Sequence, residues 1–297
     1  MCLHRRTEFS AVRIINGRLK YAAKMARRIL TSSFHKKTRL LTARCATNCL
    51  RRANAPSSKT EVFCGAHYIW RLFMEKKELL DLSPVRYFDK VVEGGLKAGE
   101  LGLITAKKGL GKTSLLVQFG MDALISDKPL VHVSFDQHSS NVISWYSSVF
   151  SEIAKKKNIS NVSELRDEIM RERTILNFNQ ESFSLPKVIN TIGALKTGGI
   201  NVQALVIDGL NLDKISTSDI ASVADFAKED KISVWFSDTK ESDKLLDSAR
   251  SDIIPLFAVI AHIEGSGGNL KLNVLKAHAK ENVGSVNLDS KTMLMSK

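Results

Sequence analysis

The sequence predicts an α/β fold: a wound, mainly parallel sheet with antiparallel strands at its C-terminal edge. From Met74 onward, short apolar segments of strand length alternate with longer segments of helical period. Val202–Ile207 is almost continuously apolar, as expected of a parallel strand covered on both faces. Leu270–Leu275 and Ser285–Leu288 then read as strands joined by a hairpin-like loop, which predicts an antiparallel pair at the edge of the sheet.

Each element is placed by its own apolar pattern and by the glycine-containing or polar segments that flank it. Strands are expected at Glu100–Thr105, Pro129–Phe135, Thr174–Phe178, Val202–Ile207, Ile232–Phe236, Pro255–Ala261, Leu270–Leu275 and Ser285–Leu288. Helices are expected from Lys112 to about Ile125, and at Val142–Lys156, Leu185–Leu195 and Ile220–Lys228. We find no internal repeat.

The composition of the chain changes abruptly near Met74. Residues 1–73 hold 16 Lys and Arg against two acids, a charge of +14, whereas residues 74–297 hold 28 bases and 29 acids, a charge of −1. All four cysteines (Cys2, Cys45, Cys49 and Cys64) also lie in the first part. We therefore predict a basic, cysteine-containing N-terminal segment, 1–73, that is disordered, followed by one domain, 74–297.

Three interpretations of the segment 1–73 stay open. The first is an organellar transit peptide, since such peptides are rich in Arg and Ser and poor in acids. The second is a basic arm that binds nucleic acid. The third is an upstream extension of a protein whose translation starts at Met74. We favour the last interpretation because charge and cysteine usage both change there. We expect free thiols rather than a metal site, because the cysteines lack a second pair at zinc-site spacing.

No apolar run approaches the roughly 18–20 residues that span a bilayer. No signal-peptide core of about 7–15 apolar residues lies near the start. We therefore expect a cytoplasmic protein without a membrane partner, and an organellar one only if residues 1–73 are a genuine transit peptide.

The segment from Ala106 to Thr113 (AKKGLGKT) matches the phosphate-loop pattern G-x-x-x-x-G-K-[ST], with alanine in place of the first glycine. Such a loop turns backbone N–H groups toward phosphate oxygens at the start of a helix. Lys112 would meet the β- and γ-phosphates, and Thr113 would offer its hydroxyl to Mg²⁺. The candidate nucleotide-binding residues are Lys107, Lys108, Gly109, Leu110, Gly111, Lys112, Thr113 and Ser114.

A second motif supports the phosphate loop. Asp208 ends the apolar strand that precedes it, and ligands of wound sheets lie beyond the carboxyl ends of the strands. There its carboxylate would hold the water shell of Mg²⁺ opposite Thr113. Thr113 and Asp208 are therefore the candidate metal ligands. An aspartate that merely ends a strand before a turn is the alternative for Asp208, and the combination of both motifs argues against it.

With these residues in place, the sequence resembles the RecA-like P-loop ATPases of the KaiC and DnaB-helicase type. The lead-in from Asp89 through GGLKAGELGLIT resembles theirs, and DnaB-type loops often begin with alanine as this one does at Ala106. The segments that start at Asp208 (DGLNL) and Leu275 (LKAH…GSVNL) are similar to their D-Y-L-Q-L and terminal K-x-R-N-G…G-x-V-x-L patterns. The resemblance covers roughly residues 83–295 and implies a RecA-like P-loop NTPase that takes ATP and Mg²⁺.

The resemblance also implies catalytic roles. Asp136 stands where the family has the glutamate that polarises the attacking water, and its shorter side chain predicts slow hydrolysis. Asp238 or Thr239 takes the place of the family's polar sensor. Lys276 matches the lysine that reaches a neighbouring subunit's nucleotide, but His278 replaces the arginine finger, which is worth roughly 10³–10⁵ in rate. The candidate catalytic residues are Asp136, Lys112 and Lys276.

Three functions follow as hypotheses. We favour an ATP-binding, slowly ATP-hydrolysing protein that acts as a homo-oligomer, for which a hexamer is one arrangement. A DNA helicase or DNA-processing ATPase is the first alternative, although DNA as a partner is not supported by the charge of −1 on residues 74–297. A nucleotide-binding scaffold with weak catalysis is the second, and the residues found at Asp136, Asp238 and His278 favour it.

Overall fold

The structure is a computed structural model that describes residues 74–135, 137–155, 162–178, 184–240, 251–266 and 268–297. Residues Glu75–Lys297 form one compact unit. The predictions made for the basic segment, 1–73, and for its cysteines lie outside the described residues, as does Asp136.

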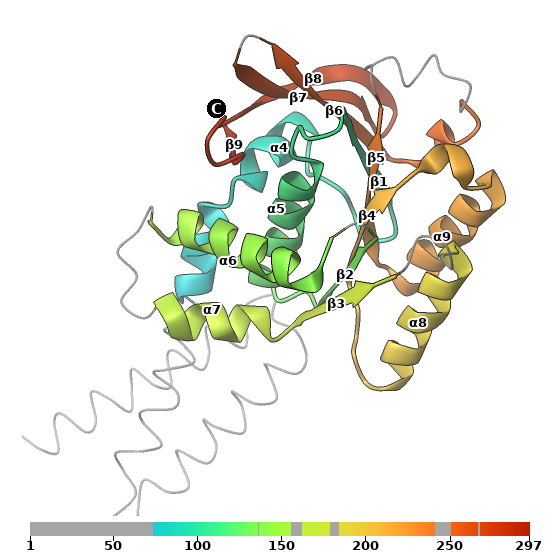
Figure 1. Ribbon diagram of the computed structural model, residues 1–297, viewed down its shortest axis with the longest axis horizontal. Helices are drawn as coiled ribbons and strands as arrows, with labels where there is room; N and C mark the ends of the chain where they lie inside the picture. Colours follow the sequence, from blue (N-terminus) through green and yellow to red (C-terminus); the bar gives the residue numbers. More distant parts are fainter. Residues whose placement is uncertain (1–73, 136, 156–161, 179–183, 241–250, 267) are drawn as a thin grey trace, which may run out of the picture. The chain divides into compact units, whose positions relative to one another are not determined.

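Nine strands of the described residues form a single sheet, in the order β3-β2-β4-β5-β1-β6-β7-β8-β9 (Figure 1). The strands from β3 through β6 pair in parallel, whereas β6, β7, β8 and β9 pair antiparallel. Their bounds are β1 Leu101–Ala106, β2 Leu130–Ser134, β3 Arg173–Asn177, β4 Ala204–Leu210, β5 Ser233–Thr239, β6 Val259–Ser266, β7 Asn269–Ala277, β8 Lys280–Leu288 and β9 Met295–Ser296. The predicted mainly parallel α/β sheet with an antiparallel C-terminal edge is confirmed.

Helices cover both faces of the parallel part of the sheet, with α5, α6 and α7 on one face and α8 and α9 on the other (Figure 1). A shorter helix, α4, contacts both α5 and β8. The bounds are α4 Val85–Val91, α5 Lys112–Ile125, α6 Ser139–Lys155, α7 Val162–Met170, α8 Leu185–Thr197 and α9 Thr217–Asp230.

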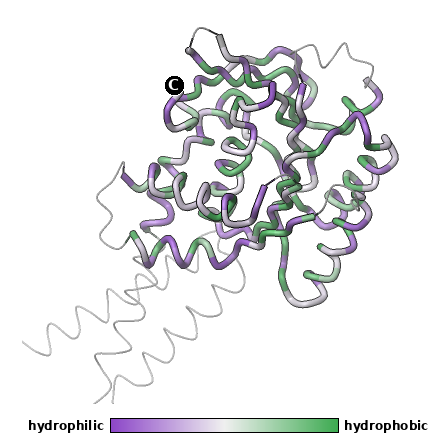
Figure 2. Tube along the Cα trace, in the orientation of Figure 1, coloured by the Kyte–Doolittle hydropathy of each residue, from purple (hydrophilic) through white to green (hydrophobic). Residues whose placement is uncertain are grey.

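Alternation along each strand assigns side chains to one of these two layers. Leu103, Val133, Ile207 and Phe236 belong to the large hydrophobic cluster that also contains the buried faces of α8 and α9. Their neighbours along the chain, among them Asp208 and Ser237, therefore face α5. The apolar strands run through the centre of the domain, and polar residues concentrate on its outer elements (Figure 2).

An aromatic cluster seats α4 and α5 on the sheet. The Phe119 and Trp235 rings stack with centroids 4.1 Å apart, and Phe88 meets both rings edge-on. The Trp235 ring lies over Gly102 on β1, where an added Cβ would come within 2.4 Å of ring carbons. The glycine one residue into β1 therefore makes room for the indole, and the cluster fixes α5 above the strand that leads to the phosphate loop.

Two predicted strands have other bounds in the structure, and four further elements were not predicted. The predicted strand at Pro255–Ala261 begins only at Val259, because Ile254–Leu256 forms a 3₁₀ turn around a proline that has no N–H for the sheet ladder. The short predicted strand at Ser285–Leu288 is nine residues long and starts at Lys280. Helices at 74–81, α4 and α7, together with strand β9, were not predicted.

A buried polar pair lies between the sheet and α6. His132 on β2 is fully buried, and its Nδ1 lies 3.0 Å from the Tyr146 hydroxyl of α6. Burial first, and the nearby Arg173 second, lower the pKa of His132 to about 3. Burial also raises the pKa of Tyr146. The pair is therefore neutral in the folded protein at any pH near neutrality.

We expect His132 to make the folded state acid-sensitive. The pKa of His132 is lower in the folded than in the unfolded chain, so the unfolded state takes up an extra proton below about pH 6.5, and stability falls as the pH falls toward 3. Between pH 6.5 and 5, the wild type should lose about 1–2 kcal/mol more unfolding free energy than His132→Gln. Urea unfolding at several pH values measures this difference; parallel curves would contradict it.

Candidate phosphate and metal site

The phosphate loop joins the end of β1 to the start of α5, as its sequence predicts. Gly109 and Gly111 both adopt a left-handed backbone, each with φ of +85°, and Gly111 is the residue directly before the helix. This conformation is strained for any residue with a Cβ. Both glycines are therefore required by the loop's shape, which presents the first N–H groups of α5 to the space above β1.

Alanine at the first position of the motif is compatible with this loop. Ala106 is the last residue of β1 and is fully buried, and it does not have the positive φ of Gly109 and Gly111. A side chain at this position therefore costs no backbone strain, and the departure from the glycine consensus leaves the loop intact.

The lysines of the loop differ in their surroundings. The Lys112 ammonium donates to the carbonyl oxygens of Ala106 and Lys107, at 3.3 and 3.4 Å, so its side chain lies back across the loop. Lys107 and Lys108 are exposed. Leu110 packs beside Gly265 of β6, and Ser114 lies in the first turn of α5. Of the three lysines, Lys112 is thus the one placed over the loop's own backbone.

The two predicted metal ligands meet in the structure. The Thr113 hydroxyl donates a 2.6 Å hydrogen bond to Oδ2 of the buried Asp208 carboxylate, although 95 residues separate them. Thr113 is held by the first turn of α5, and Asp208 by the carboxyl end of β4. The sheet thus brings the hydroxyl that ends the phosphate loop against the strand-borne acid.

The second oxygen of Asp208 is bound by a residue that sequence reasoning missed. The Ser237 hydroxyl on β5 donates to Asp208 Oδ1 at 2.6 Å and accepts a hydrogen bond from the Gly209 N–H at 3.0 Å. Ser237 is fully buried. Both carboxylate oxygens of Asp208 are therefore held, which fixes the orientation of the group.

Of the two candidate sensor residues, Thr239 is exposed at the end of β5, and Asp238 faces the opposite layer from Ser237. Its Oδ1 accepts hydrogen bonds from the N–H groups of Leu212 and Thr239, at 3.3 and 2.9 Å. The Lys240 ammonium lies 3.6 Å from Oδ2. Burial is the main cause that raises the pKa of Asp238, and Lys240 opposes it. Asp238 thus ties the end of β5 to the loop after β4, whereas the adjacent Ser237 contacts Asp208.

The oxygens of Thr113 and Asp208 suit a magnesium ion. Mg²⁺ prefers oxygen ligands and usually takes one or two from the protein, completing its octahedron with water and substrate phosphates. A carboxylate and a hydroxyl 2.6 Å apart beside a phosphate loop meet this requirement. Over the described residues, no group of three or more His, Cys, Asp or Glu side chains is placed to hold a metal.

Lys276 lies away from the phosphate loop of its own chain. It is paired across the sheet with Ile260, which neighbours Leu103 on β1. Leu103 comes three residues before Ala106. Lys276 is therefore level with a point on β1 that lies about 10 Å from the start of the loop, toward the first residue of that strand. Its ammonium donates to the Ile254 carbonyl at 2.9 Å, and burial lowers the pKa of Lys276. The structure does not bring Lys276 together with Lys112.

Comparison with known families adds one finding. Residues 83–223 match the family model described as "ATPase: KaiC". No match was found among curated proteins. The matched range contains the lead-in helix α4, the phosphate loop and the strand that carries Asp208, and it ends within α9. Among the described residues, no helix has the length and apolar character needed to cross a bilayer.

We expect Ser237→Ala to destabilise the fold through Asp208. The substitution removes the donor to a buried carboxylate oxygen and the acceptor of the Gly209 N–H, so the unfolding free energy should fall by about 1–3 kcal/mol. Ser233→Ala, at the other end of β5, is the matched control, because within the described part of the chain the Ser233 hydroxyl makes only a long 3.5 Å contact to the Gln203 carbonyl. If urea unfolding gives the same loss of unfolding free energy for Ser237→Ala and Ser233→Ala, the expected role of the Ser237–Asp208 hydrogen bond is contradicted.

Proposed function

Because the chain contains a RecA-like P-loop ATPase domain, we propose that it binds ATP with Mg²⁺ at the Ala106–Ser114 loop and hydrolyses it slowly as a homo-oligomer. The observation that carries the proposal is the hydrogen bond between Thr113 and Asp208. Two motifs that are far apart in the sequence, one for phosphates and one for the metal, converge on a single point above the ends of β1 and β4.

In the proposed binding mode, different groups of the chain bind different parts of the triphosphate. The N–H groups of the loop and of the first turn of α5 bind the phosphate oxygens, and the helix dipole favours their charge. The Lys112 ammonium moves from the carbonyls of Ala106 and Lys107 to the β- and γ-phosphates. Thr113 and Asp208 would hold a magnesium ion, which would neutralise phosphate charge.

For hydrolysis, we propose Asp136 as the residue that orients the attacking water. It follows β2, whose last residue, Ser134, is paired with Asp208 across the sheet. An aspartate reaches less far than a glutamate, and general-base contact needs about 2.6–3.2 Å. This shorter reach is the reason that we expect slow turnover.

The position of Lys276 supports the proposal of an oligomer. A lysine about 10 Å behind its own phosphate loop serves catalysis only if it reaches the nucleotide of a neighbouring subunit. The hairpin turn beyond it carries His278, whose Nδ1 lies 3.5 Å from Glu100, where the resemblance predicts an arginine. With a histidine instead of a permanently charged guanidinium, this subunit contact would accelerate hydrolysis only weakly.

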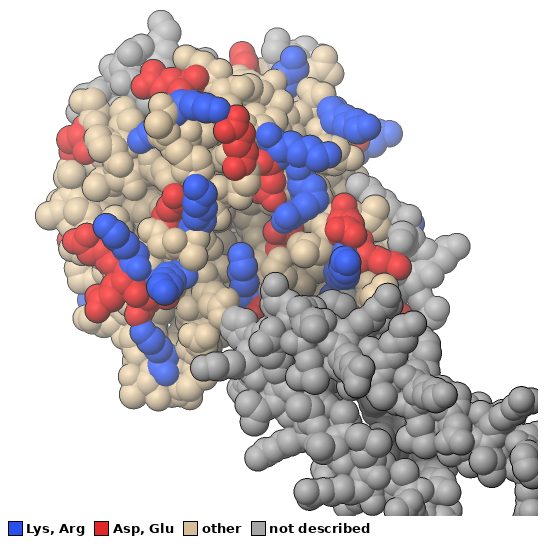
Figure 3. All heavy atoms as spheres, turned by 180° about the vertical axis from the view of Figure 1, so that it is seen from behind, with Lys and Arg blue, Asp and Glu red and all other residues tan. Residues whose placement is uncertain are grey.

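DNA as a partner draws no support from the surface of the domain. On the face shown in Figure 3, basic and acidic side chains of the described residues are interspersed, and residues 74–297 carry a charge of −1. A protein that tracks a nucleic-acid backbone needs a connected positive groove. We therefore keep ATP binding and turnover as the proposed function, and treat DNA stimulation as an outcome of its test.

The test is ATP binding to the full-length chain, by calorimetry with Mg²⁺, for the wild type and for Lys112→Ala. Removal of the ammonium should weaken binding by about 10- to 100-fold, because it deletes charge-assisted hydrogen bonds to phosphate. Lys128→Ala is the matched control: that side chain is exposed and lies beyond the opposite end of α5 from the loop, so binding should change by no more than about threefold.

Turnover measured on the same samples separates the functional hypotheses. The proposal is supported if hydrolysis is slow, if its rate per protein chain rises with protein concentration, and if single-stranded DNA does not change that rate. DNA-stimulated hydrolysis would replace it with the DNA-processing function, and tight binding without turnover would replace it with a nucleotide-binding scaffold. Folded wild-type protein that binds no ATP would refute all three.

A further inference from the structure

A lysine outside the phosphate loop is tied to the first residue of that loop. Lys240 directly follows β5, and its backbone N–H donates to the Ala106 carbonyl at 3.1 Å. The same carbonyl oxygen accepts from the Lys112 ammonium at 3.3 Å. Because both nitrogens lie against one oxygen, they are at most 6.4 Å apart, the sum of the 3.1 and 3.3 Å distances. The backbone of Lys240 therefore lies beside the lysine that would bind the phosphates.

The Lys240 ammonium is held by two carboxylates. It lies 2.6 Å from Asp213 Oδ1, in the 3₁₀ turn Leu212–Lys214 that follows β4, and 3.6 Å from Asp238 Oδ2. The Asp213 side chain is 57% exposed, and that of Lys240 is 21% exposed. Ion pairs that are open to solvent are weak. The ammonium can therefore leave Asp213 at little cost in free energy.

The length of a lysine side chain lets this ammonium reach the space above the phosphate loop. Thr239 pairs with Ala106, so Lys240 is level with Lys107, the residue that follows β1. A lysine ammonium on its four-carbon stem reaches roughly 6 Å from Cα. That reach is similar to the greatest separation that the two hydrogen bonds allow between the Lys240 backbone nitrogen and the Lys112 ammonium. A phosphate bound by Lys112 thus lies within reach of both lysines.

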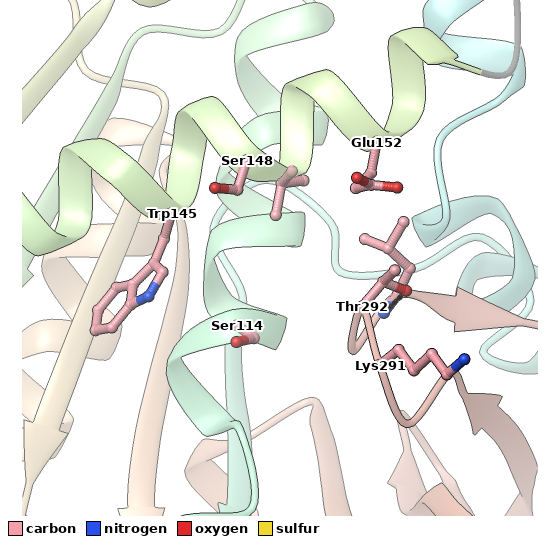
Figure 4. A pocket seen from close by; sticks show the side chains of 8 residues that line it. Ser114, Trp145, Ser148, Glu152, Lys291 and Thr292 are labelled. Atoms are coloured by element: carbon pink, nitrogen blue, oxygen red, sulfur yellow. Dashed lines mark hydrogen bonds between the residues drawn. The ribbon is translucent and has the colours of Figure 1, made fainter.

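Other lysines near the loop are less suited to bind the same phosphate. Lys291 borders a cavity of ≈ 230 Å³ between α5, α6 and the C-terminal turn, residues 289–295, but its ammonium points away from Ser114 and from α5 (Figure 4). Lys107 and Lys108 are exposed, so solvent screens their charge. Lys240, by contrast, combines a backbone that is hydrogen-bonded to the loop with a side chain that is mostly buried.

We propose that Lys240 is a second cation, supplied by the same chain, for the terminal phosphate of ATP, and that Asp213 holds it in reserve until the nucleotide binds. The proposal rests on the function proposed above. In this arrangement the Lys240 ammonium leaves Asp213 and donates to the terminal phosphate beside Lys112, where it stabilises negative charge during hydrolysis. Asp238 keeps the two N–H donors to its Oδ1. Because ADP has no third phosphate, the contact also selects ATP over ADP.

The test measures binding of ATP and of ADP to the full-length chain, by calorimetry with Mg²⁺, and turnover on the same samples. Lys240→Met keeps an unbranched side chain and the backbone N–H, and it removes the ammonium. We expect ATP affinity to fall by about tenfold and ADP affinity by less than about twofold, because a charge-assisted hydrogen bond to the third phosphate is lost. Turnover at saturating ATP should fall by about tenfold or more. Lys228→Met, an exposed residue of α9 beside Gly99 and before the start of β1, is the matched control and should change none of these values.

Asp213→Asn is the second variant, and it decides alone if Lys240→Met does not fold, because the Asp213 side chain is exposed and its charge is not needed for folding. It releases the Lys240 ammonium, so ATP affinity should rise about two- to fivefold, as expected from the strength of an exposed ion pair. The rise should be absent when both substitutions are combined.

Two results would overturn the proposal while leaving phosphate binding in place. The first is a change in ATP affinity that ADP affinity matches, or no change at all, in Lys240→Met. The second is an ATP affinity that does not rise in Asp213→Asn. A wild-type protein that binds neither nucleotide would instead refute the proposed function, and this inference with it.

Discussion

The hydrogen bond from Thr113 to Asp208 is the constraint on which the rest of the site depends. It joins the start of α5 to the end of β4, and it forms only if β1 and β4 lie in one parallel sheet with their carboxyl ends at the same edge. The aromatic cluster over Gly102 holds α5 at the height that this bond requires. Ser237 then fixes the other oxygen of the carboxylate. Packing in the core and polar contacts in the site therefore specify the same arrangement.

Local patterns were sufficient to predict the fold class, the loop between β1 and α5, and the strand that carries Asp208. The reason is physical: an apolar run, a glycine-containing turn and a helix that follows it are properties of neighbouring residues. Ser237 could not be predicted in this way, because its role depends on which face of β5 it occupies. Pairing of Ile104 with Ser237 and of Thr105 with Asp238 decides that face. Ser237 and Asp238 are adjacent on β5, yet Ser237 holds Asp208 on one face of the sheet, whereas Asp238 accepts from the Leu212 N–H on the other face.

The contact between α5 and the C-terminal turn, residues 289–295, could not be predicted from the sequence for a related reason. Gln118 and Met293 are 175 residues apart, and nothing in the apolar pattern of α5 distinguishes a glutamine that fastens a distant turn from one that faces solvent. Two-residue β9 is too short to show a period of its own. The C-terminal strands form the edge of the sheet, and the turn that follows them brings Met293 beside Gly111 of the phosphate loop. Their end belongs to the architecture of the site.

A crystal structure of the full-length protein with Mg²⁺ and a non-hydrolysable ATP analogue tests the central claim most directly. The account predicts phosphates on the N–H groups of residues 109–114, with the Lys112 ammonium against the β- and γ-phosphates. It also predicts that the Thr113 hydroxyl and the Asp208 carboxylate turn from each other to the metal, Asp208 directly or through its water shell. A nucleotide bound elsewhere would contradict the account. So would a nucleotide in the loop that leaves the Thr113–Asp208 hydrogen bond unchanged.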